Sequence, residues 1–352
     1  MTGEELRSTT VHDWKSKHVL VTGGASFIGS HLVDALVGRG ARVRVVDNLS
    51  SGRRENIADH IASGAVEFRE ADLLRSDVVD AATAGTDVVF HIAADHGGRG
   101  YIDLHQVACS TNLVLDGMVF RSAERAGAEK VVFASSGCVY PEHLQNDPGE
   151  LLYLTEGLVA PPYAADNLYG WAKLMGELTL RAYCAEGRLA AASVRYFTAY
   201  GPRCPESHAV MAMIARAMTG QDPFEIWGTG EQVRNWTHVQ DIVEGTIRAA
   251  EEIHDGTAVN IGTMERTSVV ECAREVLAYM GREARFVFDP SKPTGPYNRV
   301  SDLTLCRELL GWEPEIDFKT GLRSTIDWYL EAHDESEVRR TLEFALTERR
   351  HA

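Results

Sequence analysis

A serine, a cysteine and a tyrosine–lysine pair stand close together in the middle of this chain. Ser136 and Cys138 belong to the run Ser135-Ser-Gly-Cys-Val-Tyr140, and Tyr169 precedes Lys173 by four positions. Residues four apart share one face of a helix, so the Lys173 ammonium, together with a positively charged cofactor ring, can favour the tyrosinate form of Tyr169. A tyrosinate can remove a hydroxyl proton as hydride leaves the same carbon, while Ser136 stabilises the charge on that oxygen. The spacing therefore predicts reversible oxidation of a sugar hydroxyl.

Cys138 adds a second kind of chemistry to this group. A thiol has an ordinary pKa of about 8.5, which a helix terminus or a neighbouring cation lowers. Once a hydroxyl has become a ketone, the hydrogens on the adjacent carbons become acidic, and a thiol can exchange them. We therefore expect Cys138 to act as an acid/base group in a second step; the alternative is a small buried filler at the end of a strand.

The elements that must position these residues can be read from the apolar segments. Five segments have the composition of buried strands, and Ile28, Leu32 and Leu36 follow the first of them at helical spacing. Stretches long enough for a helix or loop separate the strands, which favours right-handed crossovers and a parallel sheet covered on both faces. The sequence thus predicts an α/β fold, a Rossmann-type doubly wound sheet; the strands are expected at residues 18–22, 42–47, 66–69, 87–93 and 131–135.

The chain is long enough for this sheet and a smaller C-terminal α/β lobe. We expect an N-terminal tail over residues 1–16, a mainly dinucleotide-binding part over 17–200, and a mainly substrate-binding lobe over 201–330 that interleaves with the sheet. Residues 331–352 are rich in charge and are expected to form a solvated helix. Prolines and glycines between residues 143 and 166 predict a loop over the active site.

The run Thr22-Gly-Gly-Ala-Ser-Phe-Ile-Gly29 lies between the first strand and its helix, where backbone N–H groups can bind a pyrophosphate. Asp47 ends the second strand about 20 residues later, where a carboxylate binds an adenosine ribose and repels a 2′-phosphate. NAD is therefore predicted over NADP, although Arg53 and Arg54 close behind weaken that preference. The predicted cofactor-binding residues are Gly23, Ser26, Phe27, Ile28, Gly29, Asp47, Asn48, Asp72, Leu73, Ala93, Ala94, Tyr169 and Lys173.

Composition excludes several other classes of protein. The formal net charge of −16 argues against a nucleic-acid binder. The six cysteines show neither metal-ligand spacing nor a disulfide framework, so no metal site is expected. The N-terminus is polar, and no apolar stretch reaches the length of a membrane span. We expect no membrane partner and a cytoplasmic location.

Together these motifs resemble the extended short-chain dehydrogenase/reductases that modify nucleotide sugars. The resemblance covers roughly residues 17–330 and includes the glycine loop, Asp47, the Ser136/Tyr169/Lys173 set and the runs at 195–202 and 227–238. Within that superfamily, the runs at 94–102, 135–142 and 224–227 are most similar to the GDP-mannose 3,5-epimerases. The resemblance implies oxidation at C4, proton exchange at C3 or C5 with Cys138 as acid/base, reduction by the same NADH, and a homodimer with paired long helices.

The resemblance also implies a nucleotide-diphosphate sugar as substrate. Arg234 and Arg299 match positions that contact the diphosphate, and a guanidinium suits bidentate phosphate binding. Glycines beside His96 allow close approach to the sugar ring. The predicted substrate-binding residues are His96, Gly97, Arg99, Ser136, Thr198, His208, Arg234 and Arg299.

Three departures from the family pattern leave alternatives open. Ser26 replaces a glycine of the dinucleotide loop, and Thr198 replaces the usual asparagine, as it does in UDP-glucuronate 4-epimerases. The loop at 203–208 lacks the lysine that the 3,5-epimerases pair with their cysteine; His208 is the candidate substitute, with Glu206 or water as alternatives. A plain 4-epimerase with a passive Cys138, of the nucleotide-hexose or UDP-glucuronate type, is the runner-up.

Two further classes are less favoured. The 4,6-dehydratases carry an Asp-Glu pair where this chain has Gly137-Cys138, so dehydration is not expected. A non-catalytic protein that senses dinucleotide and binds a partner is the alternative from another class. The complete Ser/Tyr/Lys set argues against it.

Overall fold

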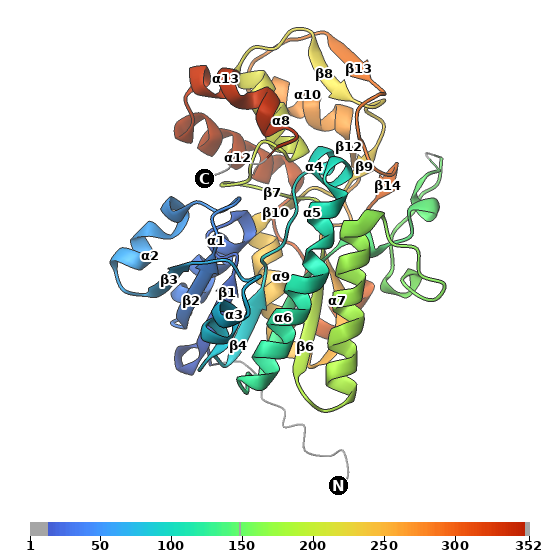
Figure 1. Cartoon of the computed structure of the whole chain (residues 1–352). Helices are drawn as coiled ribbons and strands as arrows, with labels where there is room; N and C mark the ends of the chain where they lie inside the picture. The colour runs from blue at the N-terminus through green and yellow to red at the C-terminus, as the bar shows by residue number, and fades with distance from the viewer. Residues whose placement is uncertain (1–12, 148, 349–352) are drawn as a thin grey trace.

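A seven-stranded parallel sheet forms the centre of the molecule in the computed structural model, which describes residues 13–147 and 149–348 (Figure 1). The strand order is β11-β6-β5-β4-β1-β2-β3, and every neighbouring pair is parallel. The strands are β1 His18–Thr22, β2 Arg42–Asp47, β3 Val66–Glu70, β4 Val88–His91, β5 Lys130–Ser136, β6 Ala190–Tyr196 and β11 Asp255–Ile261. The predicted Rossmann-type sheet is confirmed.

Helices cover both faces of this sheet. Successive residues of β1 point to opposite faces: Val19 and Val21 pack in the cluster that includes α1 and α9, whereas Leu20 packs in the cluster that includes α6 and α7. The helices on the first face are α1 Phe27–Gly38 and α9 Val239–Glu252, and those on the second are α3 Ser76–Thr83, α6 Asn112–Arg125 and α7 Asn167–Ala185. Burial on both faces explains the nearly continuous apolar strands.

The strand order reverses between β1 and β4, because the chain runs from β1 to β2 and β3 and then returns to β4 on the other side. Ligands of doubly wound sheets bind at the carboxyl ends of the strands beside such a switch point. The residues at those ends here are Thr22, Asp47, His91 and Ser136. The fold therefore places the glycine loop, Asp47 and Ser136 at one edge of the sheet.

A second lobe lies over this edge, at the top of Figure 1. Its helices are α8 Ala209–Met218, α10 Val269–Tyr279, α12 Phe318–Ala332 and α13 Glu335–Ala345, and its parallel pair is β8 Phe224–Trp227 with β13 Phe286–Asp289. The short strands are β7 Ala199–Tyr200, β9 Val233–Arg234, β10 Thr237–His238, β12 Thr267–Ser268 and β14 Asn298–Arg299. The remaining short helices are α2 Ala58–Ala62, α4 Arg99–Leu104, α5 Gln106–Ser110 and α11 Thr304–Leu310.

Parts of both ends of the chain pack against the rest of the protein. Of the expected tail at 1–16, residues 1–12 lie outside the described residues, while Trp14 is buried and donates to Glu251 at 2.8 Å. Helix α13 buries Val338, Leu342 and Ala345, which recur on one face at helical spacing. The expectation of a fully solvated C-terminal helix is therefore wrong for α13; residues 349–352 lie outside the described part.

Among the described residues, no helix combines the length and apolar character that a membrane crossing requires.

Candidate active site

A cavity of about 620 Å³ lies between the carboxyl edge of the sheet and the second lobe. This volume is in the range of small-molecule binding sites. Its lining includes every residue that the sequence predicted for catalysis and for substrate binding: His96, Gly97, Arg99, Ser136, Cys138, Tyr169, Lys173, Thr198, His208, Arg234 and Arg299. The tertiary structure thus gathers residues from both lobes around one space.

A smaller pocket adjoins this cavity at the switch point of the sheet. It is lined by eight of the predicted cofactor residues: Gly23, Ser26, Asp47, Asn48, Asp72, Leu73, Ala93 and Ala94. Phe27 and Ile28 line the larger cavity instead, next to the catalytic residues. Gly29 lines neither pocket. It allows α1 to pack closely on the glycine loop, since a Cβ there would lie 2.1 Å from the carbonyl oxygen of Gly23.

The glycine loop has the shape that a dinucleotide needs. Gly23 has a φ of 69°, and a Cβ on it would lie 2.9 Å from the backbone of Ala93. Ser26 occupies the position of a glycine, and its hydroxyl donates to the Gly23 carbonyl at 2.6 Å. The hydroxymethyl group therefore bonds within the loop. The substitution is compatible with the loop geometry.

Asp47 holds this loop against the end of β2. Its carboxylate accepts hydrogen bonds from the N–H groups of Ala25, at 3.0 Å, and Leu49, at 2.8 Å. A Cβ on Gly52 would lie 2.8 Å from the same carboxylate, so only a glycine fits beside it. Burial raises the pKa of Asp47, although the two N–H groups oppose that shift. The lining of this pocket fits an adenosine ribose, as expected for NAD.

The contact of α7 with the turn after β5 brings together Ser136, Cys138 and Tyr169, the three residues predicted to be catalytic. The backbone N–H of Cys138 donates to the Ser136 hydroxyl at 3.1 Å, which starts a short helical turn at Gly137–Val139. The N–H of Asp166 donates to the carbonyl of Cys138 at 2.9 Å. A Cβ on Gly170 would lie only 2.2 Å from that carbonyl, so the glycine lets α7 approach the turn.

Lys173 is buried in α7, and its amine lacks a hydrogen-bond acceptor within the described part of the chain. Its Nζ has no hydrogen-bond partner among the described residues and lies 4.6 Å from the centroid of the Phe133 ring. Burial lowers the pKa of Lys173, and Asp116 opposes the shift. An unpaired buried amine is costly unless a ligand supplies its acceptor. The hydroxyl groups of a nicotinamide ribose fit this position.

The surroundings of Tyr169 in the cofactor-free protein favour its neutral form. Lys173 Nζ lies 5.9 Å from the centroid of the Tyr169 ring. Burial raises the pKa of Tyr169, and Cys138 and Cys109 add to the rise. Desolvation of the phenolate thus dominates in the protein without its cofactor, and the expected tyrosinate, which needs Lys173 together with the positive charge of a nicotinamide ring, stays a prediction.

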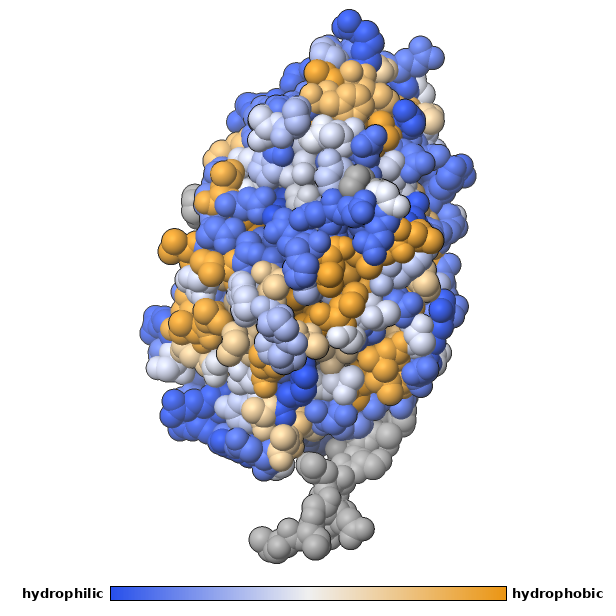
Figure 2. Space-filling view, turned by 90° about the vertical axis from the view of Figure 1, so that its right-hand side faces the viewer, coloured by the Kyte–Doolittle hydropathy of each residue, from blue (hydrophilic) through white to orange (hydrophobic). Residues whose placement is uncertain are grey.

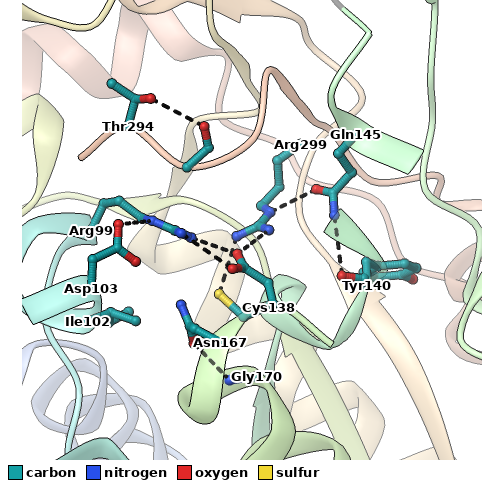
Figure 3. Close-up of polar contacts among 12 residues, drawn as sticks. Arg99, Ile102, Asp103, Cys138, Tyr140, Gln145, Asn167, Gly170, Thr294 and Arg299 are labelled. Atoms are coloured by element: carbon teal, nitrogen blue, oxygen red, sulfur yellow. Dashed lines mark hydrogen bonds and ion pairs between the residues drawn. The ribbon is translucent and has the colours of Figure 1, made fainter. Parts of the chain in front are cut away.

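Cys138 is the residue whose surroundings the sequence least anticipated. Its Sγ accepts a hydrogen bond from Nη1 of Arg299 at 3.2 Å (Figure 3). Nε of Arg299 donates to Gln145 at 3.0 Å, and its Nη2 donates to Asp166 at 2.8 Å. The residue expected on the diphosphate thus lies against the thiol, and contact with a diphosphate stays a prediction.

Asp166 was not identified from the sequence. It is the N-cap residue of α7, but its carboxylate bonds to Arg299 and, at 2.6 Å, to Nη1 of Arg99. Burial would raise the pKa of Asp166, yet Arg299 and Arg99 outweigh it and lower the pKa. The signal in the sequence was an acidic residue just before a helix, which indicates a cap and no more.

Arg234 and Arg216, which also line the cavity, differ in how many of their N–H groups form hydrogen bonds. The guanidinium of Arg234 donates to the carbonyls of Val233 and Thr294, both at 2.8 Å. Burial lowers the pKa of Arg234 to about 9, and Arg299 and Arg99 contribute to the shift. Arg216 of α8 also lines the cavity; it is buried, and its Nε and Nη2 lack partners within the described part of the chain. Sequence reasoning missed it because it is a single charge in an apolar helix.

The loop at 203–208 places His208 at the start of α8, facing the cavity. Its ring centroid lies 6.3 Å from that of Phe27 and 6.4 Å from that of His96. Burial lowers the pKa of His208 to about 4, so the ring is neutral at pH 7. Glu206, the alternative partner for Cys138, accepts a hydrogen bond from Tyr329 at 3.0 Å. Both residues line the cavity, and the pairing of either with Cys138 stays a prediction.

Comparison with known proteins adds an independent assignment. The model of the family described as "NAD dependent epimerase/dehydratase family" matches residues 19–262. The chain is 32% identical to UDP-glucuronic acid decarboxylase 2 of Arabidopsis thaliana, over 88% of this chain and 67% of that protein. It is 32% identical to GDP-mannose 3,5-epimerase 1 of Oryza sativa subsp. japonica, over 90% and 83%.

A solved structure shares both the fold and the type of ligand expected here. The structure of UDP-glucuronic acid 4-epimerase from Bacillus cereus, in complex with UDP-glucuronic acid and NAD, superposes with a TM-score of 0.79. The alignment has 26% sequence identity and covers 90% of this chain and 100% of that chain. These relatives carry out different reactions on nucleotide sugars.

Proposed function

Because the chain belongs to the NAD-dependent epimerase/dehydratase family, we propose that it is a nucleotide-sugar epimerase that works through a transient 4-keto sugar, with Cys138 in the second step. The observation that carries the proposal is the 3.2 Å hydrogen bond from Arg299 to Cys138 Sγ, in the cavity that Ser136 and Tyr169 also line. A guanidinium on the thiol is expected of a cysteine that exchanges protons and is not needed by a passive one.

The first step assigns a role to each residue of the Ser/Tyr/Lys set. Tyr169 removes the proton of the C4 hydroxyl, and Ser136 donates a hydrogen bond to the oxygen as its charge develops. Bound NAD would supply the acceptor for the hydride of C4 and, once reduced, the hydride that restores the alcohol. Lys173 holds the nicotinamide ribose through its otherwise unpaired Nζ, and its charge favours the tyrosinate once the cofactor is in place.

The second step exchanges a proton on a carbon next to the ketone. His208 is neutral near pH 7 and accepts the proton from C3 or C5, which leaves an enolate. Cys138 then delivers its thiol proton to that carbon, and Arg299 stabilises the thiolate that remains. In the reverse direction the two residues exchange roles. Proton removal and delivery by different groups allow the stereocentre to invert.

The substrate class follows from the charge in the cavity and from the relatives. Arg216 is buried with unpaired N–H groups, and an anionic diphosphate would supply the acceptors it lacks. Arg234 adds positive charge in the same space, while His96 and Gly97 border the position of the sugar. In this proposal residues 17–200 mainly bind NAD and residues 201–330 mainly bind the nucleotide-diphosphate sugar.

The same proposal includes a homodimer. Apolar side chains are exposed on α5 and α7, including Val107 at 81%, Met175 at 44% and Trp171 at 39%. Figure 2, viewed from the side where α7 lies in Figure 1, shows apolar surface in patches across the middle of this face. Such a surface on two adjacent helices favours burial against a second copy. Sedimentation of the wild type and of V107E would test this part separately.

The experiment that tests the function incubates the protein with NAD and a panel of nucleotide sugars in deuterated water. NMR and mass spectrometry then locate deuterium in the products. We expect label at C3 or C5, lost in C138A, and kept in C184A, because Cys184 is half-buried and lies outside the cavity. In Y169F all turnover should disappear, since both steps depend on the ketone.

Two other outcomes would assign a different reaction. Inversion at C4 without solvent label would make the protein a plain 4-epimerase, which Thr198 in the cavity and the Bacillus cereus relative favour as the second candidate. Loss of carbon dioxide from a uronate would instead match the Arabidopsis decarboxylase. Absence of both NAD binding and turnover would favour a non-catalytic role.

A further inference from the structure

We propose that Asp166 is a positioning residue, which fixes the Arg299 guanidinium on the Cys138 thiol and links Arg299 to Arg99 of α4. The proposal rests on the proposed function, because it gives Cys138 a reason to need a fixed cation. It adds a residue that neither the sequence motifs nor the dinucleotide fold assigns.

The first observation is that one buried carboxylate serves two guanidinium groups. Oδ2 of Asp166 accepts from Nη2 of Arg299 at 2.8 Å and from Nη1 of Arg99 at 2.6 Å, and Oδ1 accepts from Nη2 of Arg99 at 3.3 Å. The residue is 2% exposed, so these charge-assisted bonds form away from water. Without the carboxylate, two like charges would face each other across a small gap.

The second observation is how few contacts hold Arg299 in place. Its Nε donates to Gln145, its Nη2 to Asp166 and its Nη1 to Cys138. Of these three partners, only Asp166 carries a full negative charge at pH 7 while Cys138 is a thiol. The direction of Nη1 therefore depends mainly on the bond between Nη2 and Asp166, because the planar guanidinium turns as one unit.

The third observation is that the backbone of Asp166 forms hydrogen bonds that do not depend on its side chain. The Asp166 N–H donates to the Cys138 carbonyl at 2.9 Å, and the Asp166 carbonyl accepts from Gly170 at 3.1 Å. These links to the cysteine turn and to α7 survive any substitution of the side chain except proline. A change from aspartate to asparagine thus removes the charge and leaves the backbone frame of the site intact.

The charged and titratable groups around Cys138 come from four elements and must be considered together. They are Arg299 of β14, Arg99 of α4, Arg234 of β9, Asp166 at the start of α7 and Tyr169 within α7. If Asp166 acted only through its charge, its removal would leave a more positive cluster and would favour the thiolate. If it acts by positioning Arg299, its removal disfavours the thiolate. The two roles have opposite signs.

The test measures the reactivity of Cys138 and needs no substrate. Wild-type protein and D166N are alkylated with iodoacetamide across a range of pH, and the Cys138 peptide is quantified by mass spectrometry. We expect alkylation of Cys138 at neutral pH to slow by about tenfold in D166N, because the reacting sulfur loses the guanidinium that is fixed beside it. An unchanged or faster rate would overturn the proposal.

A matched control is available on the same network. Asp103 accepts from Nε of Arg99 at 2.8 Å and is not bonded to Arg299, so D103N removes the same charge without touching the cation on the thiol. We expect its alkylation profile to match the wild type. If D103N slows alkylation as much as D166N does, the loss of one negative charge beside Arg99 is sufficient for the effect. That result would overturn the positioning role of Asp166.

Two further variants protect the test against misfolding. D166E keeps the carboxylate and should restore at least half of the lost alkylation rate, whereas R299M should slow alkylation at least as much as D166N. Failure of both expectations would refute the proposal even if D166N itself were unstable. If alkylation behaves as expected but no nucleotide sugar is turned over, the proposed function fails and the positioning of Arg299 stands.

Discussion

Lys173 and Lys130 form a natural matched pair for asking what an unpaired buried amine costs. Both side chains are 1% exposed. Nζ of Lys130 donates to the Ala250 carbonyl at 2.5 Å and lies 3.3 Å from His254, whereas Nζ of Lys173 has no partner within the described residues. A buried donor without an acceptor costs about 1–3 kcal/mol. We therefore predict that K173M makes the cofactor-free protein more stable by about 1–2 kcal/mol.

The control has the opposite expected sign. Burial also lowers the pKa of Lys130, to about 7, so the comparison is made at about pH 10, where neither cost of deprotonation remains. K130M then leaves the Ala250 carbonyl without its donor and should lower the free energy of unfolding by about 1 kcal/mol. Urea denaturation of protein freed of nucleotide measures both changes through the midpoint of unfolding. A K173M protein that is destabilised as much as K130M would refute the reasoning, because Lys173 would then have a favourable environment without a ligand.

The pH dependence gives an internal check on the same variant. Burial lowers the pKa of Lys173 in the folded protein, so the unfolded chain binds an additional proton between the folded and unfolded pKa values. Wild-type stability therefore rises with pH across this window, and K173M removes that rise. The advantage of K173M should shrink as the pH approaches the unfolded value of about 10.4. NAD should stabilise the wild type more than K173M, because only the wild type offers it the amine.

Two other substitutions test the packing that builds the site. G170A should reduce turnover by at least about tenfold, since its Cβ would lie 2.2 Å from the Cys138 carbonyl and would push α7 from the turn, whereas G117A, with open space around its Cβ, should be active. E177Q should lower the free energy of unfolding in urea by about 3 kcal/mol, because it leaves the buried Arg195 without the carboxylate at 2.8 Å; a loss below 1 kcal/mol would contradict this.

The sequence predicted those parts of the site whose residues lie close together along the chain. The loop at 22–29 joins β1 directly to α1, and Asp47 follows at the end of the next strand, so the order of elements alone places them at one edge. Tyr169 and Lys173 share a helix. Binary patterns report such short-range relations well, because the period of a helix or strand fixes which residues share a face.

Other expectations depended on packing and came out differently. Tyr169 and Lys173 share a helix face as their spacing predicts, but the spacing does not show that burial raises the pKa of Tyr169 in the protein without cofactor. Helix α13 carries many charges, yet its face of Val338, Leu342 and Ala345 is buried. In both cases the residue types were interpreted correctly, but the sequence did not show how deeply the side chains are buried. Burial depends on what lies above a segment in space, which a single sequence does not state.

The sequence by itself thus determined the doubly wound sheet, the dinucleotide loop and the presence of a serine, a tyrosine, a lysine and a cysteine beside it. Only the tertiary structure decided what surrounds that cysteine. Arg299 reaches Cys138 across 161 positions of the chain, and Asp166 reaches Arg299 across 133. Such contacts form because the second lobe closes over the sheet, and no local pattern records where one lobe will meet another.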